Sequence, residues 1–75
     1  MSRLAAQVRD AKRLPDPGLA RAIRVAAEVS QEQIAAELGV HRVTVARWGA
    51  GARRPRGRLR IAYAVLLREL QEAGR

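Results

Sequence analysis

Arginine is the residue type in this sequence best suited to chemistry with a charged partner. The chain has 75 residues, of which 15 are basic and 7 acidic, and all but one of the basic residues are arginines. No acidic residue occurs between Glu37 and Glu69, and that stretch holds eight arginines: Arg42, Arg47, Arg53, Arg54, Arg56, Arg58, Arg60 and Arg68. The remainder of the chain has no net charge. Positive charge gathered in one segment is typical of a protein that binds a polyanion.

Other site chemistries find little support in the sequence. The hydroxyls of Ser30 and Thr44 have no partners arranged as in a catalytic triad, and the carboxylates fall on predicted solvent faces. His41 is the only histidine and cysteine is absent, so neither a histidine-based nor a thiolate metal site can be assembled. We therefore predict no enzymatic activity, no metal and no cofactor.

The composition favours helices. Fifteen residues are alanine, leucine and glutamate are also frequent, and phenylalanine is absent. We predict an all-α domain, and the length leaves room for only one. Helical spacing of apolar residues predicts helices over 17–28, 30–38, 41–49 and 58–72. The expected division is an N-terminal amphipathic helix or basic arm (1–14), the domain (15–72) and a tail (73–75).

Local signals mark where these helices begin and end. Asp16 is a suitable N-cap and Pro17 suits the first helical position. Ser30 and Gln33 have the spacing of a capping box, which predicts a helix start at Ser30. Gly39 is expected in the left-handed position just past the end of that helix. The helix over 17–28 should bury the apolar side chains of Leu19, Ala22, Ile23, Ala26 and Ala27.

Residues 31–51 combine two such helices into one unit. About three residues around Gly39 connect them, and Ala35 is small where the two helices must approach closely. Ile34, Val45 and Trp48 are apolar where the pair must rest on the other helices. The polar residues between them would then face outward together, which is the geometry of a DNA-reading helix-turn-helix.

Over residues 19–70 the sequence resembles the lambda-repressor/Cro-like, or XRE-type, helix-turn-helix proteins. The spans that carry the resemblance are Ala22-Ile23-Arg24, Ser30 to Ala35, Leu38-Gly39-Val40, Val43-Thr44-Val45 with Trp48, and Arg53-Arg54-Pro55. The resemblance implies a compact four- to five-helix domain that binds double-stranded DNA. It further implies that the helix over 41–49 enters the major groove.

The resemblance also implies roles for individual residues. Contacts with base edges are expected from His41, Arg42, Val43, Thr44 and Arg47. Contacts with phosphates are expected from Gln31, Arg53, Arg54, Arg56 and Arg58. Arginine can bind guanine O6 and N7 with two hydrogen bonds, and valine can pack on a thymine methyl group.

Two positions depart from the pattern of the family. The family commonly has an acidic residue directly after the aromatic at Trp48, and that residue pairs with the arginine at Arg24. Here Gly49 takes its place, so Arg24 must pair elsewhere, with Glu28 or with a phosphate as the alternatives. His41 stands where serine or threonine usually caps the helix, and we expect it to cap poorly.

The leading functional interpretation is a small transcriptional regulator of the repressor or Cro type, of phage or mobile-element character. The alternatives are an antitoxin-type interaction module that regulates its own synthesis, and a nonspecific nucleic-acid binder. A homodimer on an inverted-repeat site is expected, with a candidate dimer surface on the last helix formed by Tyr63, Leu66, Leu67 and Leu70. No small-molecule effector is expected, because no second domain is present to bind one.

The sequence also bears on where the protein acts. No apolar run approaches the roughly 18 residues that a membrane span requires. The first residues lack the apolar stretch of a secretory signal. We therefore expect no association with membranes and a cytoplasmic, nucleoid-associated protein.

Overall fold

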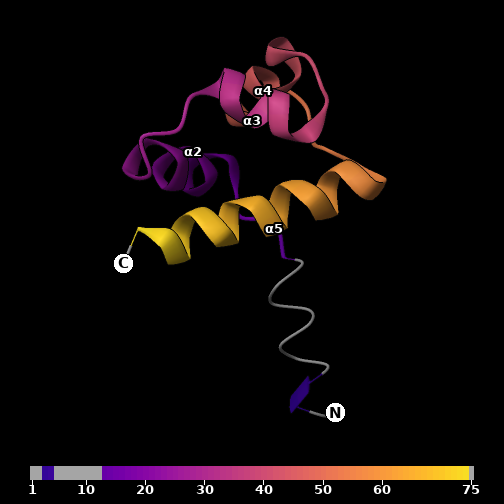
Figure 1. Cartoon of the computed structure of the whole chain (residues 1–75). Coiled ribbons are helices and arrows are strands. Elements are labelled where there is room, and N and C mark those ends of the chain that lie inside the picture. The colour runs from indigo at the N-terminus through magenta and orange to yellow at the C-terminus, as the bar shows by residue number, and fades with distance from the viewer. Residues whose placement is uncertain (1–2, 5–12, 75) are drawn as a thin grey trace.

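The chain folds into a small helical domain, shown in Figure 1. The computed structural model describes residues 3–4 and 13–74. Its helices are α2 (Pro17–Ala26), α3 (Gln31–Leu38), α4 (Arg42–Gly49) and α5 (Gly57–Ala73), and no strand occurs in the described part. The all-α prediction is confirmed. Most of the helix or arm expected over residues 1–14 falls on 5–12, outside the described residues.

Side chains cap the first helices as the sequence predicts. The Leu19 amide donates to the Asp16 carboxylate at 2.9 Å, and Pro17 occupies the first turn of α2. At the start of α3 the Gln33 amide donates to Ser30 Oγ at 3.0 Å, and the Ser30 amide donates to Gln33 Oε1 at 2.8 Å. These bonds satisfy amides that have no partner within the helix, so both starts are fixed locally.

Three successive helices end in the same way. A residue with positive φ follows each of them: Glu28 (58°), Gly39 (69°) and Gly51 (74°). The amide one residue later donates to the carbonyl five residues back, at 3.1, 2.9 and 3.0 Å respectively. This is the Schellman closure, in which glycine is the usual residue. Glu28 is the exception, and its left-handed backbone ends α2 at Ala26 rather than at the expected Glu28.

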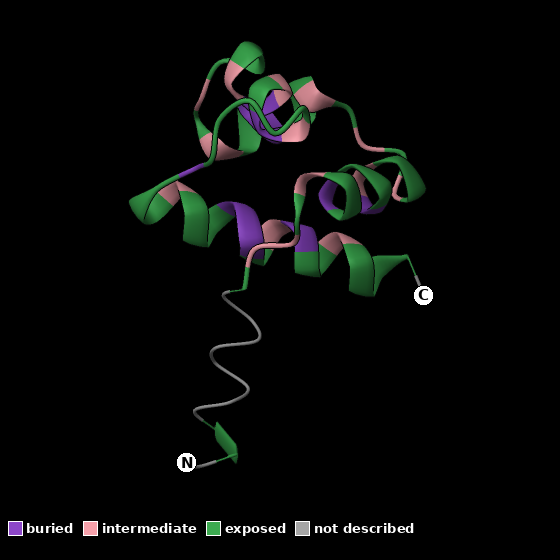
Figure 2. Ribbon diagram, turned by 180° about the vertical axis from the view of Figure 1, so that it is seen from behind, coloured by how far each residue is buried: buried purple, intermediate pink, exposed green. Residues whose placement is uncertain are grey.

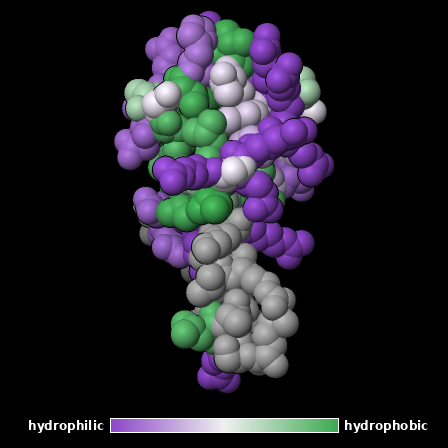
Figure 3. Space-filling view, turned by 90° about the vertical axis from the view of Figure 1, so that its right-hand side faces the viewer, coloured by the Kyte–Doolittle hydropathy of each residue, from purple (hydrophilic) through white to green (hydrophobic). Residues whose placement is uncertain are grey.

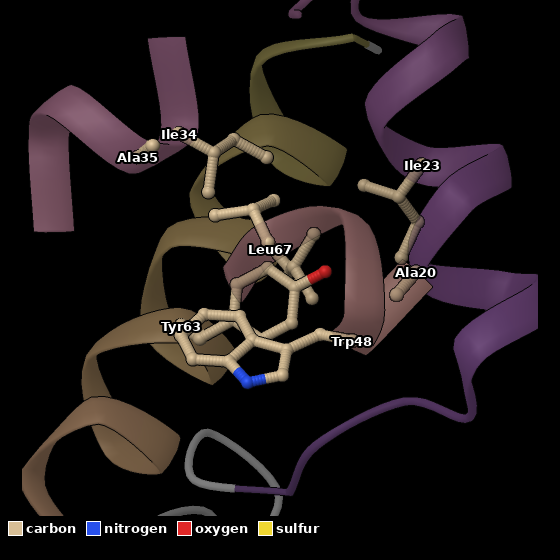
Figure 4. Close-up of a cluster of buried hydrophobic side chains, with 8 residues drawn as sticks. Ala20, Ile23, Ile34, Ala35, Trp48, Tyr63 and Leu67 are labelled. Carbon is tan, nitrogen blue, oxygen red and sulfur yellow. The ribbon is translucent and has the colours of Figure 1, made fainter. Parts of the chain in front are cut away.

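The core lies where α5 crosses the other helices. In Figure 1 α3 and α4 form one layer and α5 runs along the opposite side, with α2 packed beside them. Ile34 of α3, Val45 of α4 and Leu67 of α5 are almost completely buried, and Figure 2 shows buried residues on the facing sides of the helices. The rings of Trp48 and Tyr63 join α4 to α5, with centroids 4.9 Å apart and planes inclined by 38° (Figure 4).

Packing differs from the expected apolar faces at two places. In α2 the buried residues are Ala20 and Ile23, whereas Leu19 is 48% exposed and Ala22 and Ala26 are also exposed, so the expected burial of these three is wrong. In α5 Tyr63 and Leu67 are 4% and 0% exposed, so they belong to the domain core. The prediction that these two residues belong to the dimer surface is therefore wrong.

The helix ends and the connecting loop need only small corrections. α5 begins one residue earlier than expected, at Gly57, and continues to Ala73, inside the expected tail. Pro55 is buried in the loop that precedes it. No helix in the described ranges has the length and apolar character needed to cross a bilayer.

Candidate nucleic-acid interface

Helix α4 has one buried side and one exposed side. Val45 and Trp48 are 2% and 5% exposed, because they pack into the core. The five residues expected to read bases lie elsewhere on the helix and its N-cap: His41, Arg42, Val43 and Arg47 are exposed and Thr44 is half-buried. The helix thus holds these five side chains on a rigid support and leaves each of them at least partly accessible to a ligand.

His41 caps α4, contrary to expectation. Its Nδ1 atom accepts a hydrogen bond from the Val43 amide at 3.1 Å. An imidazole nitrogen that accepts carries no proton, so in the neutral ring the proton is on Nε2. His41 therefore does locally what serine or threonine would do, and it keeps one N–H donor for a ligand.

Arg42 has an internal partner that sequence reasoning missed. Its Nε atom lies 3.9 Å from Oε1 of Glu32, and both side chains are well exposed. Glu32 is in the first turn of α3, ten residues before Arg42. The turn at Gly39 folds α4 back against α3 and brings the two residues together, so no short-range signal could reveal the pair.

The residues expected to contact phosphates are all accessible to some degree. Gln31 is the first residue of α3 and is half-buried. Arg53 and Arg54 lie in the loop before α5, Arg56 is its N-cap and Arg58 lies in its first turn, and all four are exposed. Hydrophilic side chains cover much of this end of the molecule (Figure 3). No carboxylate occurs between Leu38 and Arg68, so the local field attracts anions.

Arg24 bonds to the backbone in place of the acidic partner found in the family. Its Nη1 atom donates to the carbonyl oxygen of Val29 at 2.9 Å. Of the two alternatives raised by the sequence, pairing with Glu28 is not among the ion pairs of the described residues. Arg24 also acts on Tyr63: burial raises the pKa of the Tyr63 hydroxyl, and the nearby positive charge of Arg24 partly offsets this rise.

The arrangement suits recognition of a polyanion better than catalysis. Guanidinium groups are planar donors that match the oxygen atoms of guanine and phosphate. In the part of the chain that the structure describes, His, Asp and Glu side chains form no group that could hold a metal ion.

Comparison with known proteins identifies the same unit. A family model described as helix-turn-helix matches residues 21–70, about two thirds of the chain. The match begins within α2 and ends within α5, so it includes the complete pair α3 and α4. No curated protein and no solved structure matches the chain.

Proposed function

The chain belongs to the XRE-type, lambda-repressor/Cro-like helix-turn-helix family of DNA-binding proteins, and on that premise we propose that it is a sequence-specific transcriptional regulator of the repressor or Cro type. One observation carries the proposal. The exposed residues of α4 and its N-cap include two arginines, while the same helix is anchored in the core by Val45 and Trp48. A helix fixed on one side and exposed on the other fits the major groove of DNA.

In this proposal α4 enters the major groove with its N-terminal turn. Arg42 and Arg47 bind guanine edges, Val43 contacts a thymine methyl group, and His41 and Thr44 supply further polar contacts. Val43 is 40% exposed although it is apolar, which supports a role in contact rather than in the core.

The phosphates flanking that groove are bound at two places. Gln31 binds one at the start of α3, where the helix dipole and free amides favour an anion. The loop and first turn of α5 bind others through Arg53, Arg54, Arg56 and Arg58. These contacts set the orientation of the protein and carry most of the salt dependence of binding.

Two chains are proposed to bind one operator. A single domain reads only a few base pairs, and proteins of this architecture bind as two-fold pairs on half-sites about 34 Å apart. Ile61 and Val65 of α5 are 41% and 37% exposed and lie one turn apart, with the half-buried Leu66 and Leu70 beside them. This surface replaces the one expected from Tyr63 and Leu67.

Selection of bound duplexes from a random pool tests the proposal. The expected result is one enriched inverted-repeat motif, with two chains per duplex in native mass spectrometry. If no motif is enriched but duplex binding still weakens with salt, the protein binds nucleic acid without sequence specificity. A single chain on a non-palindromic motif would remove the dimer from the proposal.

A further inference from the structure

A cleft lies where the acidic residue typical of the family would project. It has a volume of about 190 Å³ and is lined by residues from all four helices, including Arg21 and Arg24 of α2, Gln31 of α3, Gly49 of α4 and Tyr63 of α5. A methyl group built on Gly49 would lie 3.9 Å from Nε2 of Gln31. A longer side chain at position 49 would therefore extend over Gln31, and glycine leaves that space open.

The polar side chains that line the cleft all carry hydrogen-bond donors, and none of the lining residues is a carboxylate; the rest of the lining is Val45, Ala46, Gly49 and Ala50. Arg21 is exposed and Arg24 half-buried, and neither forms an ion pair with a described residue. Arg24 uses Nη1 for Val29, which leaves the other N–H groups of its guanidinium. Two guanidinium groups and one amide around a small space form a positive site, and no carboxylate of the described residues forms an ion pair with either arginine.

The hydroxyl of Tyr63 is a further hydrogen-bond donor at the cleft. Tyr63 is 4% exposed, and no hydrogen bond of its hydroxyl is found within the described residues. Figure 4 shows this hydroxyl directed away from the Trp48 ring toward the α2 side, where Arg24 lies. No fully buried side-chain oxygen or nitrogen among the described residues lacks a partner, so this hydroxyl reaches the open cleft, where a bound anion would accept a hydrogen bond from it.

We propose that this cleft binds one phosphate group, which Arg21, Arg24, Gln31 and Tyr63 hold in the space left by Gly49. The main source of this phosphate is the DNA backbone beside the N-terminus of α3, so the proposal rests on the proposed function. Free inorganic phosphate has the same chemistry and is the second source. A phosphate of the ligand thus takes the place of the carboxylate that the family commonly has at position 49. Arg24 then contacts the ligand rather than an internal carboxylate.

Substitution of Gly49 tests the site without removing any donor. Gly49→Glu places a carboxylate in the cleft, and duplex affinity should fall roughly tenfold, the equivalent of one lost charge-assisted hydrogen bond. The slope of log affinity against log salt should become shallower by about 0.9, the value for one phosphate contact. Gly49→Ala should bind like wild type, because its methyl group makes only an ordinary contact.

Further controls separate a loss of the phosphate contact from the effects of added charge and of unfolding. Ala22→Glu adds the same charge to α2 at an exposed position outside the cleft lining, and it should weaken binding less. Thermal unfolding of each variant establishes that it is folded. Titration of the wild type with inorganic phosphate, followed by NMR of the Gln31 side-chain amide, tests the second source, and Gly49→Glu should abolish any response.

The outcomes distinguish this proposal from the proposed function. If the wild-type protein selects no motif, the proposed function is contradicted, whatever the variants do. The wild type could instead bind its motif specifically while Gly49→Glu leaves the salt slope unchanged and inorganic phosphate gives no response. That result would overturn the phosphate site in the cleft and leave the proposed function intact. A response to inorganic phosphate with an unchanged salt slope would assign the site to the free anion.

Discussion

Arg24 and Val29 are joined by two hydrogen bonds that run in opposite directions. The Val29 amide donates to the Arg24 carbonyl at 3.1 Å, and Nη1 of Arg24 donates to the Val29 carbonyl at 2.9 Å. The same pair of residues thus closes the end of α2 and fixes the chain entering α3. The guanidinium is held in place by the backbone, without the carboxylate that the family commonly supplies.

Between these two residues Glu28 has a conformation that suits glycine. Its φ of 58° is left-handed, which costs about 1–2 kcal/mol for a residue with a Cβ atom. Glu28→Gly should raise the free energy of unfolding by about 0.5–1 kcal/mol, after allowance for the greater backbone entropy of glycine. Urea unfolding measures the change. Glu28→Ala keeps the strain and removes the charge, so an equal gain in that variant would show that charge is the cause.

Glu32 should limit the affinity of the protein for DNA. The pair with Arg42 is exposed and weak, worth about 0.2–1 kcal/mol, but the Glu32 carboxylate competes with a base or phosphate for the Arg42 guanidinium. Glu32→Gln should therefore strengthen duplex binding by roughly two- to fivefold. Glu37→Gln is the matched control, since it removes an exposed carboxylate from α3 that has no ion pair with a described residue. Equal effects of the two substitutions would refute a specific role for the pair.

His41 should contribute to stability through its cap. His41→Ala removes the acceptor for the Val43 amide and should lower the free energy of unfolding by about 0.5–2 kcal/mol. His41→Ser supplies an oxygen that can cap in the same way, so its stability should match that of the wild type or exceed it. Thermal unfolding compares the three proteins. If both variants lose the same stability, the hydrogen bond to Nδ1 is not what stabilises the start of α4.

Short-range features of this fold could be predicted from the sequence, because their partners are close in the chain. The caps at Asp16 and Ser30 and the left-handed Gly39 depend on residues within five positions, and the structure confirms all three. The capping role of His41 was missed because imidazole is a less common cap than a hydroxyl or carboxylate.

Features that depend on the packing of distant elements could not be predicted in the same way. α5 has apolar residues over a wide arc, and only the positions of α2, α3 and α4 decide that Tyr63 and Leu67 are buried while Ile61 and Val65 are exposed. The contact between Glu32 and Arg42 and the cleft at Gly49 likewise arise from the angle between helices.

Tyr63 should make the protein sensitive to alkali. Burial raises the pKa of its hydroxyl above the ordinary value of 10.0, with the charge of Arg24 acting in the opposite direction. The neutral phenol is therefore favoured in the folded state, and its contribution to stability is complete below the unfolded-state pKa. That contribution is lost as pH rises through the folded-state pKa. Tyr63 is the only tyrosine, so Tyr63→Phe should reduce the fall in melting temperature above about pH 10. Identical pH profiles for the two proteins would contradict this.

The central claim is that α4 reads DNA sequence, and Arg42 offers the most direct test. Duplex selection should be run in parallel on the wild type and Arg42→Ala, with Arg58→Ala as an exposed control expected to contact only phosphate. The account predicts that Arg42→Ala loses base preference at one position of each half-site and about 1–3 kcal/mol on the wild-type motif. Arg58→Ala should keep the motif and bind all duplexes more weakly. An unchanged motif in Arg42→Ala, or an altered one in Arg58→Ala, would contradict the assignment of base reading to α4.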